Sequence, residues 1–183
     1  MDKKVLASAA SAAALAALAV PALAGAHAVV SPVQPQGDAL TSARTAYVLR
    51  VPTERPNVGT WRVRMLVPAA VQEAISFQKL PGWRVDLRRV NTGKKDADGN
   101  AVLKTTSVTW TAKTRDAEAD PGFYAEFPFR FQNPATPGTS CFRVVQSYRK
   151  DRRHRLGGEV VRWFGSETSD TPASCITFKA AAS

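Results

Sequence analysis

Apolar and polar residues alternate along most of the chain with a period of two. In residues 61–67 every second residue is apolar, and Arg62 and Arg64 occupy the opposite face. The same alternation recurs in residues 45–51 and 83–88. Because successive side chains of a strand point to opposite faces, this period predicts half-buried β-strands. Beyond the N-terminal leader, no segment shows a convincing helical period.

The clearest alternation lies in residues 123–131. Phe123, Phe127, Phe129 and Phe131 share one face with a small alanine, while the intervening positions are mainly polar. A face that carries four phenylalanines predicts a strand packed on a hydrophobic core. We therefore expect all four rings to be core residues.

Further strands are predicted between turn signals that contain glycine or proline. The dipeptide Asp98-Gly99 is typical of a hairpin turn and precedes a strand that begins near Ala101. Short strands at such spacing predict an all-β, antiparallel β-sandwich, with a single domain over residues 27–183. The other strands are expected at residues 107–110, 142–148, 159–164 and 176–178.

The first 26 residues have the pattern of a secretory signal peptide. Lys3 and Lys4 precede a run of alanine, leucine and valine, which Pro21 ends before a stretch of small residues. A membrane anchor is the alternative, but the run is rich in alanine and barely long enough to span a bilayer. No second apolar run follows. The sequence thus predicts an exported product of the periplasm, cell envelope or medium, with no membrane span in the mature chain.

Two cleavage sites of the small-x-small type compete at the end of this leader. Cleavage after Ala24 would leave Gly25 first, and cleavage after Ala26 would leave His27 first. An N-terminal histidine carries an α-amine and an imidazole on one residue, and together they chelate a single copper(II) ion. The amine must lose a proton to bind, so copper affinity should fall in mild acid.

The chain contains two cysteines, Cys141 and Cys175. In an oxidising compartment an even pair predicts a disulfide, and a loop of this length should stabilise the fold by roughly 3–4 kcal/mol. The alternative is a copper–thiolate site. Neither cysteine has a nearby histidine or a Cys-x-x-Cys partner, which favours the disulfide.

The formal net charge is +10, which permits binding to nucleic acid, anionic membranes or acidic polymers. The basic residues are nevertheless scattered over predicted strands, apart from a dense cluster at residues 149–155 that includes His154. No recognition helix accompanies this cluster, so no nucleic-acid partner is expected. We interpret most of the charge, including the cluster, as a solvated surface.

Several short motifs cover nearly all of the chain after the leader. They are Ala-His-Ala-Val-Val-Ser-Pro at 26–32, Arg-Val-Pro-Thr-Glu at 50–54, Leu-Pro-Gly-Trp at 80–83, Val-Thr-Trp at 108–110, Tyr-Ala-Glu-Phe-Pro-Phe-Arg at 124–130, Asn-Pro at 133–134, Glu-Val-Val-Arg-Trp at 159–163 and Thr-Pro-Ala at 171–173. In their order and spacing these motifs resemble one known family, the YcnI-like domains, which are exported bacterial domains associated with copper handling.

The resemblance implies a sandwich of the immunoglobulin or cupredoxin kind with a copper(II) site at the mature N-terminus. Carried onto this chain, the site comprises His27, a carboxylate, and Trp163 packed close by. Counting from His27 places the carboxylate near Asp38, whereas counting back from the Arg-Val-Pro motif places it near Thr45. Asp38 is the candidate ligand, although aspartate between glycine and proline commonly serves turns. Glu126 is the second acidic candidate, with a surface role as the simpler interpretation.

Three functional hypotheses follow. The first is a non-enzymatic copper(II)-binding protein for storage, delivery or homeostasis, whose partner is another exported or membrane copper-handling protein. The second is an oxidative copper enzyme of the polysaccharide-cleaving type, which would need His154 as a second imidazole. The third is a metal-free, basic interaction module of the envelope. No hydrolytic or nucleotide-binding motif is present in the sequence, and the oligomeric state stays open.

Overall fold

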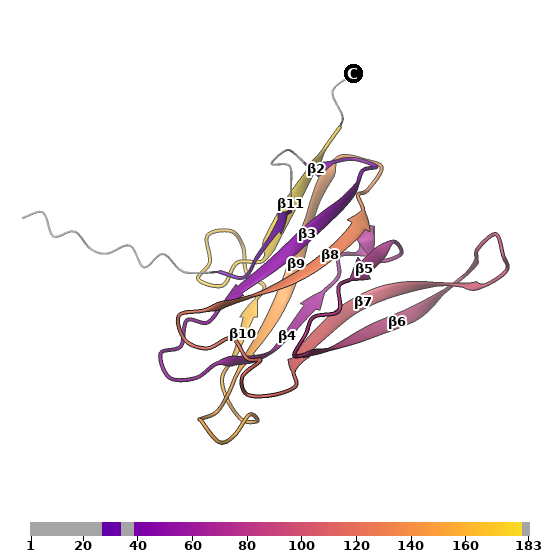
Figure 1. Cartoon of the computed structure of the whole chain (residues 1–183). Coiled ribbons are helices and arrows are strands. Elements are labelled where there is room, and N and C mark those ends of the chain that lie inside the picture. Colours follow the sequence, from indigo (N-terminus) through magenta and orange to yellow (C-terminus); the bar gives the residue numbers. More distant parts are fainter. Residues whose placement is uncertain (1–26, 34–38, 181–183) are drawn as a thin grey trace, which may run out of the picture.

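The computed structural model describes residues 27–33 and 39–180, which form two β-sheets packed face to face (Figure 1). The smaller sheet has four antiparallel strands in the order β1-β3-β8-β5. The prediction of an antiparallel sandwich is therefore confirmed. Its strands are β1 (Val29–Pro32), β3 (Arg44–Pro52), β8 (Tyr124–Gln132) and β5 (Ile75–Phe77).

The larger sheet has seven strands in the order β2-β11-β9-β4-β7-β6, and β10 also pairs with β9. The pairs are antiparallel except for β11 with β2. Within the described residues, the helical structure consists of a single 3₁₀ turn, η1 (Ala69–Val71), and no helix is long and apolar enough to cross a membrane. The strands are β2 (Ala39–Leu40), β11 (Ser174–Lys179), β9 (Gly138–Tyr148), β4 (Thr60–Leu66), β7 (Ala101–Ala112), β6 (Trp83–Lys95) and β10 (Val160–Trp163).

The core lies between the inner faces of the two sheets. Alternate residues of β3, β4, β7 and β8 are buried there, as the period of two predicts. Aromatic rings fill its centre: Tyr47 stacks on Phe131 with ring centroids 4.3 Å apart, and Trp110 lies 4.6 Å from Phe127. Each such side chain contributes about 1.5–3 kcal/mol through burial. The largest fully buried apolar and aromatic side chains are Trp110, Trp163, Tyr47, Tyr148, Phe127, Phe131, Phe142 and Phe178.

Two details of the expected strands were wrong. Phe123 is not a core residue, because β8 begins one residue later and the Phe123 side chain is 68% exposed. The turn before it contains Gly122 at a positive φ of 82°, which places Phe123 outside the pleat of the strand. The strand near Ala101 and the strand at 107–110 are one continuous strand, β7.

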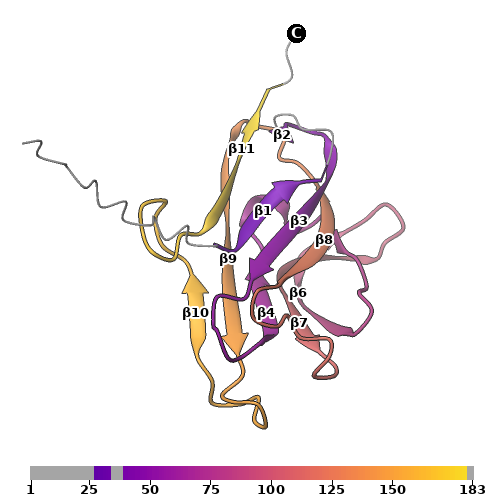
Figure 2. The same ribbon diagram turned by 60° about the vertical axis from the view of Figure 1, so that its left-hand side comes forward.

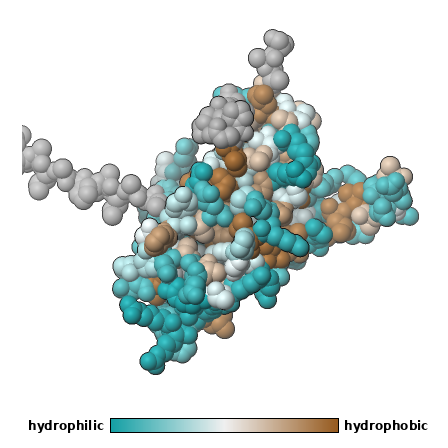
Figure 3. Space-filling view, viewed as in Figure 1, coloured by the Kyte–Doolittle hydropathy of each residue, from teal (hydrophilic) through white to brown (hydrophobic). Residues whose placement is uncertain are grey.

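Strand β7 forms a long hairpin with β6, and the tip of this hairpin projects beyond the sandwich (Figure 1). Figure 3 shows hydrophobic side chains on this projecting part, which otherwise carries hydrophilic ones. Leu103, which is 44% exposed, lies in this part of β7. The alternating pattern predicted β6 over residues 83–88 only, which is shorter than the observed strand. The outer half of the hairpin has no second sheet to cover it, so apolar residues there do not alternate cleanly.

The predicted disulfide is confirmed. Cys141 and Cys175 are directly opposite each other in the register of β9 and β11, and their sulfur atoms are bonded. The bond therefore joins the C-terminal strand to the centre of the larger sheet. Disulfides of this kind persist in oxidising compartments.

The basic cluster at 149–155 is only partly the solvated loop that we expected. Arg149 is 7% exposed, and its Nη1 donates a 2.7 Å hydrogen bond to the carboxylate of Glu118, whose side chain is fully buried. Arg155 donates to the same carboxylate, and Arg115 approaches it at 3.5 Å. Three guanidinium groups thus compensate one buried carboxylate and tie the loop after β9 to the loop after β7.

Candidate metal centre

His27 lies two residues before Val29, the first residue of β1, and is half-buried. The position of His27 is fixed by β1, which contacts both sheets. Ala28 is 1% exposed, β1 pairs with β3, and the backbone N–H of Val30 donates a 2.8 Å hydrogen bond to Ser174 Oγ on β11. The backbone at His27 is therefore held at the place where β1 bridges the smaller sheet and the C-terminal strand.

The indole ring of Trp163 lies beside the imidazole of His27. Their centroids are 5.6 Å apart, with the ring planes inclined by 52°. Trp163 ends β10 and is 2% exposed. Its Nε1 donates a 3.1 Å hydrogen bond to Oε1 of the buried Gln146. Gln146 Nε2 in turn donates to Pro52 O and to Thr60 Oγ1, each at 2.7 Å. This buried polar chain fixes the orientation of the indole.

A cavity of about 520 Å³ opens next to His27. One carboxylate, that of Glu167, lines it together with hydroxyl groups from β9 and β11. The disulfide-bonded Cys175 forms part of the same wall. The full lining comprises His27, Ala28, Val29, Thr139, Glu167, Pro172, Ala173, Ser174, Cys175 and Thr177.

Glu167 is carried by the loop between β10 and β11, which lies beside the start of β1 (Figure 2). The loop closes on itself: Gly165 N–H donates to Thr171 O at 2.8 Å, and Ala173 N–H donates to Gly165 O at 3.0 Å. A Cβ atom at position 165 would overlap the side chain of Ser169. Glycine is therefore required at this point of close approach. No pattern in the sequence indicated that Glu167 would line the same cavity as His27.

The structure brings together two of the residues predicted for the site, His27 and Trp163. Asp38 and the leader, residues 1–26, lie outside the described residues. Glu126 is not in this cavity; it pairs with Arg50 at 2.7 Å on the exposed surface of the smaller sheet. Its predicted surface role therefore matches its position.

His154 lies on the loop that precedes β10, whereas Trp163 and His27 lie at the other end of that strand (Figure 2). Its Nδ1 is 2.9 Å from the carboxylate of Asp151. This hydrogen bond, with those donated by the backbone N–H groups of Arg153 and His154, lowers the pKa of Asp151 to about 2. His154 therefore serves a local loop contact and does not face His27.

The donors around His27 suit copper(II) if the chain is cleaved before this residue. Among the described residues, no group of three or more histidine, cysteine, aspartate or glutamate side chains could hold a metal. On a chain that begins at His27, this residue would offer two nitrogens, its amine and its imidazole. With a carboxylate oxygen from Glu167 or from a neighbouring segment, these make a mixed nitrogen and oxygen set, which copper(II) favours.

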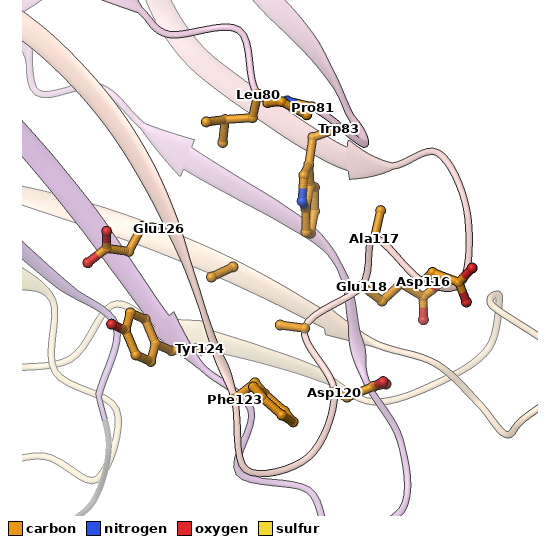
Figure 4. Close-up of a pocket in the computed structure, with 12 residues that line it drawn as sticks. Leu80, Pro81, Trp83, Asp116, Ala117, Glu118, Asp120, Phe123, Tyr124 and Glu126 are labelled. Atoms are coloured by element: carbon orange, nitrogen blue, oxygen red, sulfur yellow. The ribbon is translucent and has the colours of Figure 1, made fainter.

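A second cavity lies between β6, β8 and the loop after β7 (Figure 4). Trp83 and Phe123 line it, with Asp116 and Asp120 on the adjoining loop. Its carboxylates are largely engaged, since Asp120 pairs with Arg115 at 2.5 Å and the buried Glu118 with the arginines described above.

The comparisons with known proteins agree with this architecture. The model of the family described as "Domain of unknown function (DUF1775)" matches residues 27–178. An uncharacterized protein from Nocardia farcinica, described as having an immunoglobulin-like fold, is 21% identical with a TM-score of 0.60, covering 85% of this chain and 99% of that one. No curated protein matches the chain.

Two further solved structures match with lower TM-scores. A cohesin module from Clostridium perfringens has a TM-score of 0.44 at 6% identity, covering 85% of this chain and 98% of the module. The bacterial hydrophobin BslA has a TM-score of 0.42 at 9% identity, covering 86% of this chain and 95% of that one. The immunoglobulin-like sandwich is thus shared with the Nocardia protein.

Proposed function

This chain belongs to the DUF1775 family, which includes the YcnI-like domains, and from that premise we propose that the protein is an exported copper(II)-binding protein. Copper is its cargo, held for storage, delivery or homeostasis, and the protein is not an enzyme. Its partner is another exported or membrane copper-handling protein. The match to the family begins at His27, where the second cleavage site would create a new N-terminus.

The observation that carries this proposal is the position of His27. It stands half-buried at a cavity, with the ring of Trp163 centred 5.6 Å away and Glu167 in the cavity wall. A residue that merely followed a leader would need neither a buried anchor at Ala28 nor an ordered indole beside it. On a chain that begins at His27, this position supports the proposal because the amine and the imidazole would stand on an anchored backbone with an oxygen donor in the same cavity.

Each residue has a separate task in this proposal. His27 binds the ion through its amine, which must first lose a proton, and through its imidazole. Asp38 or Glu167 supplies the oxygen and offsets part of the positive charge. Trp163 covers one side of the site with an apolar surface, which restricts further ligands and excludes water.

Calorimetric titration with copper(II) tests the proposal on protein that begins at His27. His27→Ala, or acetylation of the amine, should weaken binding by more than about 100-fold, beyond the 10–100-fold typical for losing an outer-shell partner. A second histidine variant, His154→Ala, is the matched control and should bind as the wild type does. Unchanged affinity in the His27→Ala variant would contradict the proposal.

The carboxylate is identified by a second set of variants. Either Asp38→Asn or Glu167→Gln should weaken copper binding by at least about 10-fold, and the one that does so is the ligand. Glu126→Gln removes a carboxylate far from the cavity and serves as the control. Equal, small effects in all three variants would exclude both carboxylates as ligands.

A further inference from the structure

The outer face of the larger sheet carries a row of arginines. In the register, Arg62 of β4 and Arg84 of β6 both pair with Thr111, while Arg64 pairs with Thr109 of β7 and Val145 of β9. The residues between them along β4, such as Val63, are buried in the core. These arginines therefore point to the side of the sheet that faces away from the core. The basic face comprises Arg62, Arg64, Arg84, Arg88, Arg143 and Arg162, on β4, β6, β9 and β10.

This basic face has almost no compensating negative charge. Within the described part of the chain, Asp86 is the carboxylate that shares the face in the register, and it pairs with Arg84 at 2.9 Å. Arg62, Arg64 and Arg88 form no ion pair with any described carboxylate. Three exposed guanidinium groups elsewhere are paired, Arg50 with Glu126, Arg55 with Glu159 and Arg115 with Asp120. Other exposed arginines without an ion pair are divided among β3, the outer part of β6, β8 and the loop before β10. Five of the unpaired arginines thus share this one face: Arg62, Arg64, Arg88, Arg143 and Arg162.

The centre of the face is shallow and polar. A depression there is lined by hydroxyl groups and arginines from three neighbouring strands. Neighbouring strands lie about 4.8 Å apart and alternate residues about 6.8 Å apart, so the guanidinium groups form a two-dimensional array over a flat surface. The lining comprises Arg62, Arg64, Asp86, Leu87, Arg88, Ser107 and Thr109.

We propose that this face binds a linear polyanion built of phosphodiester units. Arginine presents two parallel N–H donors that match the oxygens of a phosphate group, and serine and threonine hydroxyls add further donors. An array of such groups on a flat sheet contacts several successive phosphates of one chain. The lack of large exposed apolar side chains at the centre of the depression disfavours insertion into a membrane, which needs an apolar face as well as positive charge.

The test measures binding of poly(glycerol phosphate) to the whole mature protein as a function of salt concentration. Each phosphate contact should contribute about 0.7 to the slope of log affinity against log salt, by analogy with single-stranded nucleic acid. The double variant R64Q/R88Q should therefore lower the slope by about 1.4. At 50 mM salt, the loss of these two phosphate contacts should weaken binding of the polymer by about 60-fold.

The control is R152Q/R153Q, which removes the same charge from the exposed loop before β10. It should keep the slope of the wild type. Equal losses in the two double variants would overturn the proposal, because binding would then follow net charge alone. Absence of binding to the polymer at low salt, or equal affinity for monomeric inorganic phosphate, would also overturn it. So would binding to phosphatidylglycerol vesicles without binding to the polymer.

Discussion

Two buried tryptophans offer a direct test of the polar chain beneath the candidate site. Trp163 and Trp110 are 2% and 0% exposed, and replacing either by phenylalanine removes a similar volume from the core. They differ in one respect. Trp163 Nε1 donates to Gln146, whereas Trp110 Nε1 has no hydrogen-bond partner in the described part of the chain. The difference between Trp163→Phe and Trp110→Phe therefore isolates the hydrogen bond.

The size of the difference in unfolding free energy follows from the buried group that each substitution leaves without a partner. Trp163→Phe leaves the Oε1 acceptor of the fully buried Gln146 without its donor, which costs about 1–3 kcal/mol beyond the loss of volume. Trp110→Phe removes a donor that was already unsatisfied, so it carries no such penalty. Trp163→Phe should lower the free energy of unfolding by about 1–3 kcal/mol more than Trp110→Phe does.

Urea unfolding measures this difference. The two variants should share one m-value, so that the change in midpoint reports stability alone. An equal loss in both variants, or a larger loss in Trp110→Phe, would refute the assigned role of the Gln146 hydrogen bond. The same proteins test the copper site, since copper(II) bound at His27 should quench the fluorescence of the nearby Trp163. The quenched fraction should fall in Trp163→Phe and persist in Trp110→Phe.

Three further predictions concern the disulfide and the charged loops. Replacing Cys141 and Cys175 by serine should lower the free energy of unfolding by roughly 3–4 kcal/mol in denaturant titrations, and an unchanged midpoint would contradict this. Glu118→Gln should lower the free energy of unfolding by about 3–5 kcal/mol, because it leaves the buried charge of Arg149 uncompensated. Thermal unfolding measures this loss, and a smaller loss would show that the arginines are re-solvated in the variant. The carboxyl of Asp151 should titrate near pH 2 by NMR, because His154 and two backbone N–H groups lower its pKa. Its contribution to stability is therefore present above the usual aspartate pKa and lost as the pH falls through about 2. His154→Ala should raise that pKa toward its ordinary value, and no change would contradict the assigned contact.

The strands of the core could be predicted from the sequence because a sheet with one buried face imposes its period on the residues. Phe127, Phe129 and Phe131 obey that rule, and each is at most 3% exposed. Phe123 breaks it, because the left-handed Gly122 turn ends the alternation before the strand begins. The short strands β1, β2 and β5 were missed, since two to four residues are too few to show a period.

The candidate site was harder to predict, because its parts are far apart in the sequence. The neighbourhood of His27 and Trp163 was expected from the family resemblance alone, and no local pattern of residues implied it. Glu167 reaches the cavity through the closed loop at Gly165, and such a tertiary approach leaves no periodic signal. Glu118 and Arg149 were missed for the same reason: their burial depends on two loops that meet only in the folded protein.

The central claim is that one residue supplies two nitrogens to copper(II). Electron paramagnetic resonance of the copper(II) protein, with nitrogen-15 in its histidines, tests this most directly on a chain that begins at His27. We expect superhyperfine coupling to two equatorial nitrogens, both from His27, and coupling to the imidazole nitrogen alone after acetylation of the amine. An unchanged spectrum in the acetylated protein would contradict the claim.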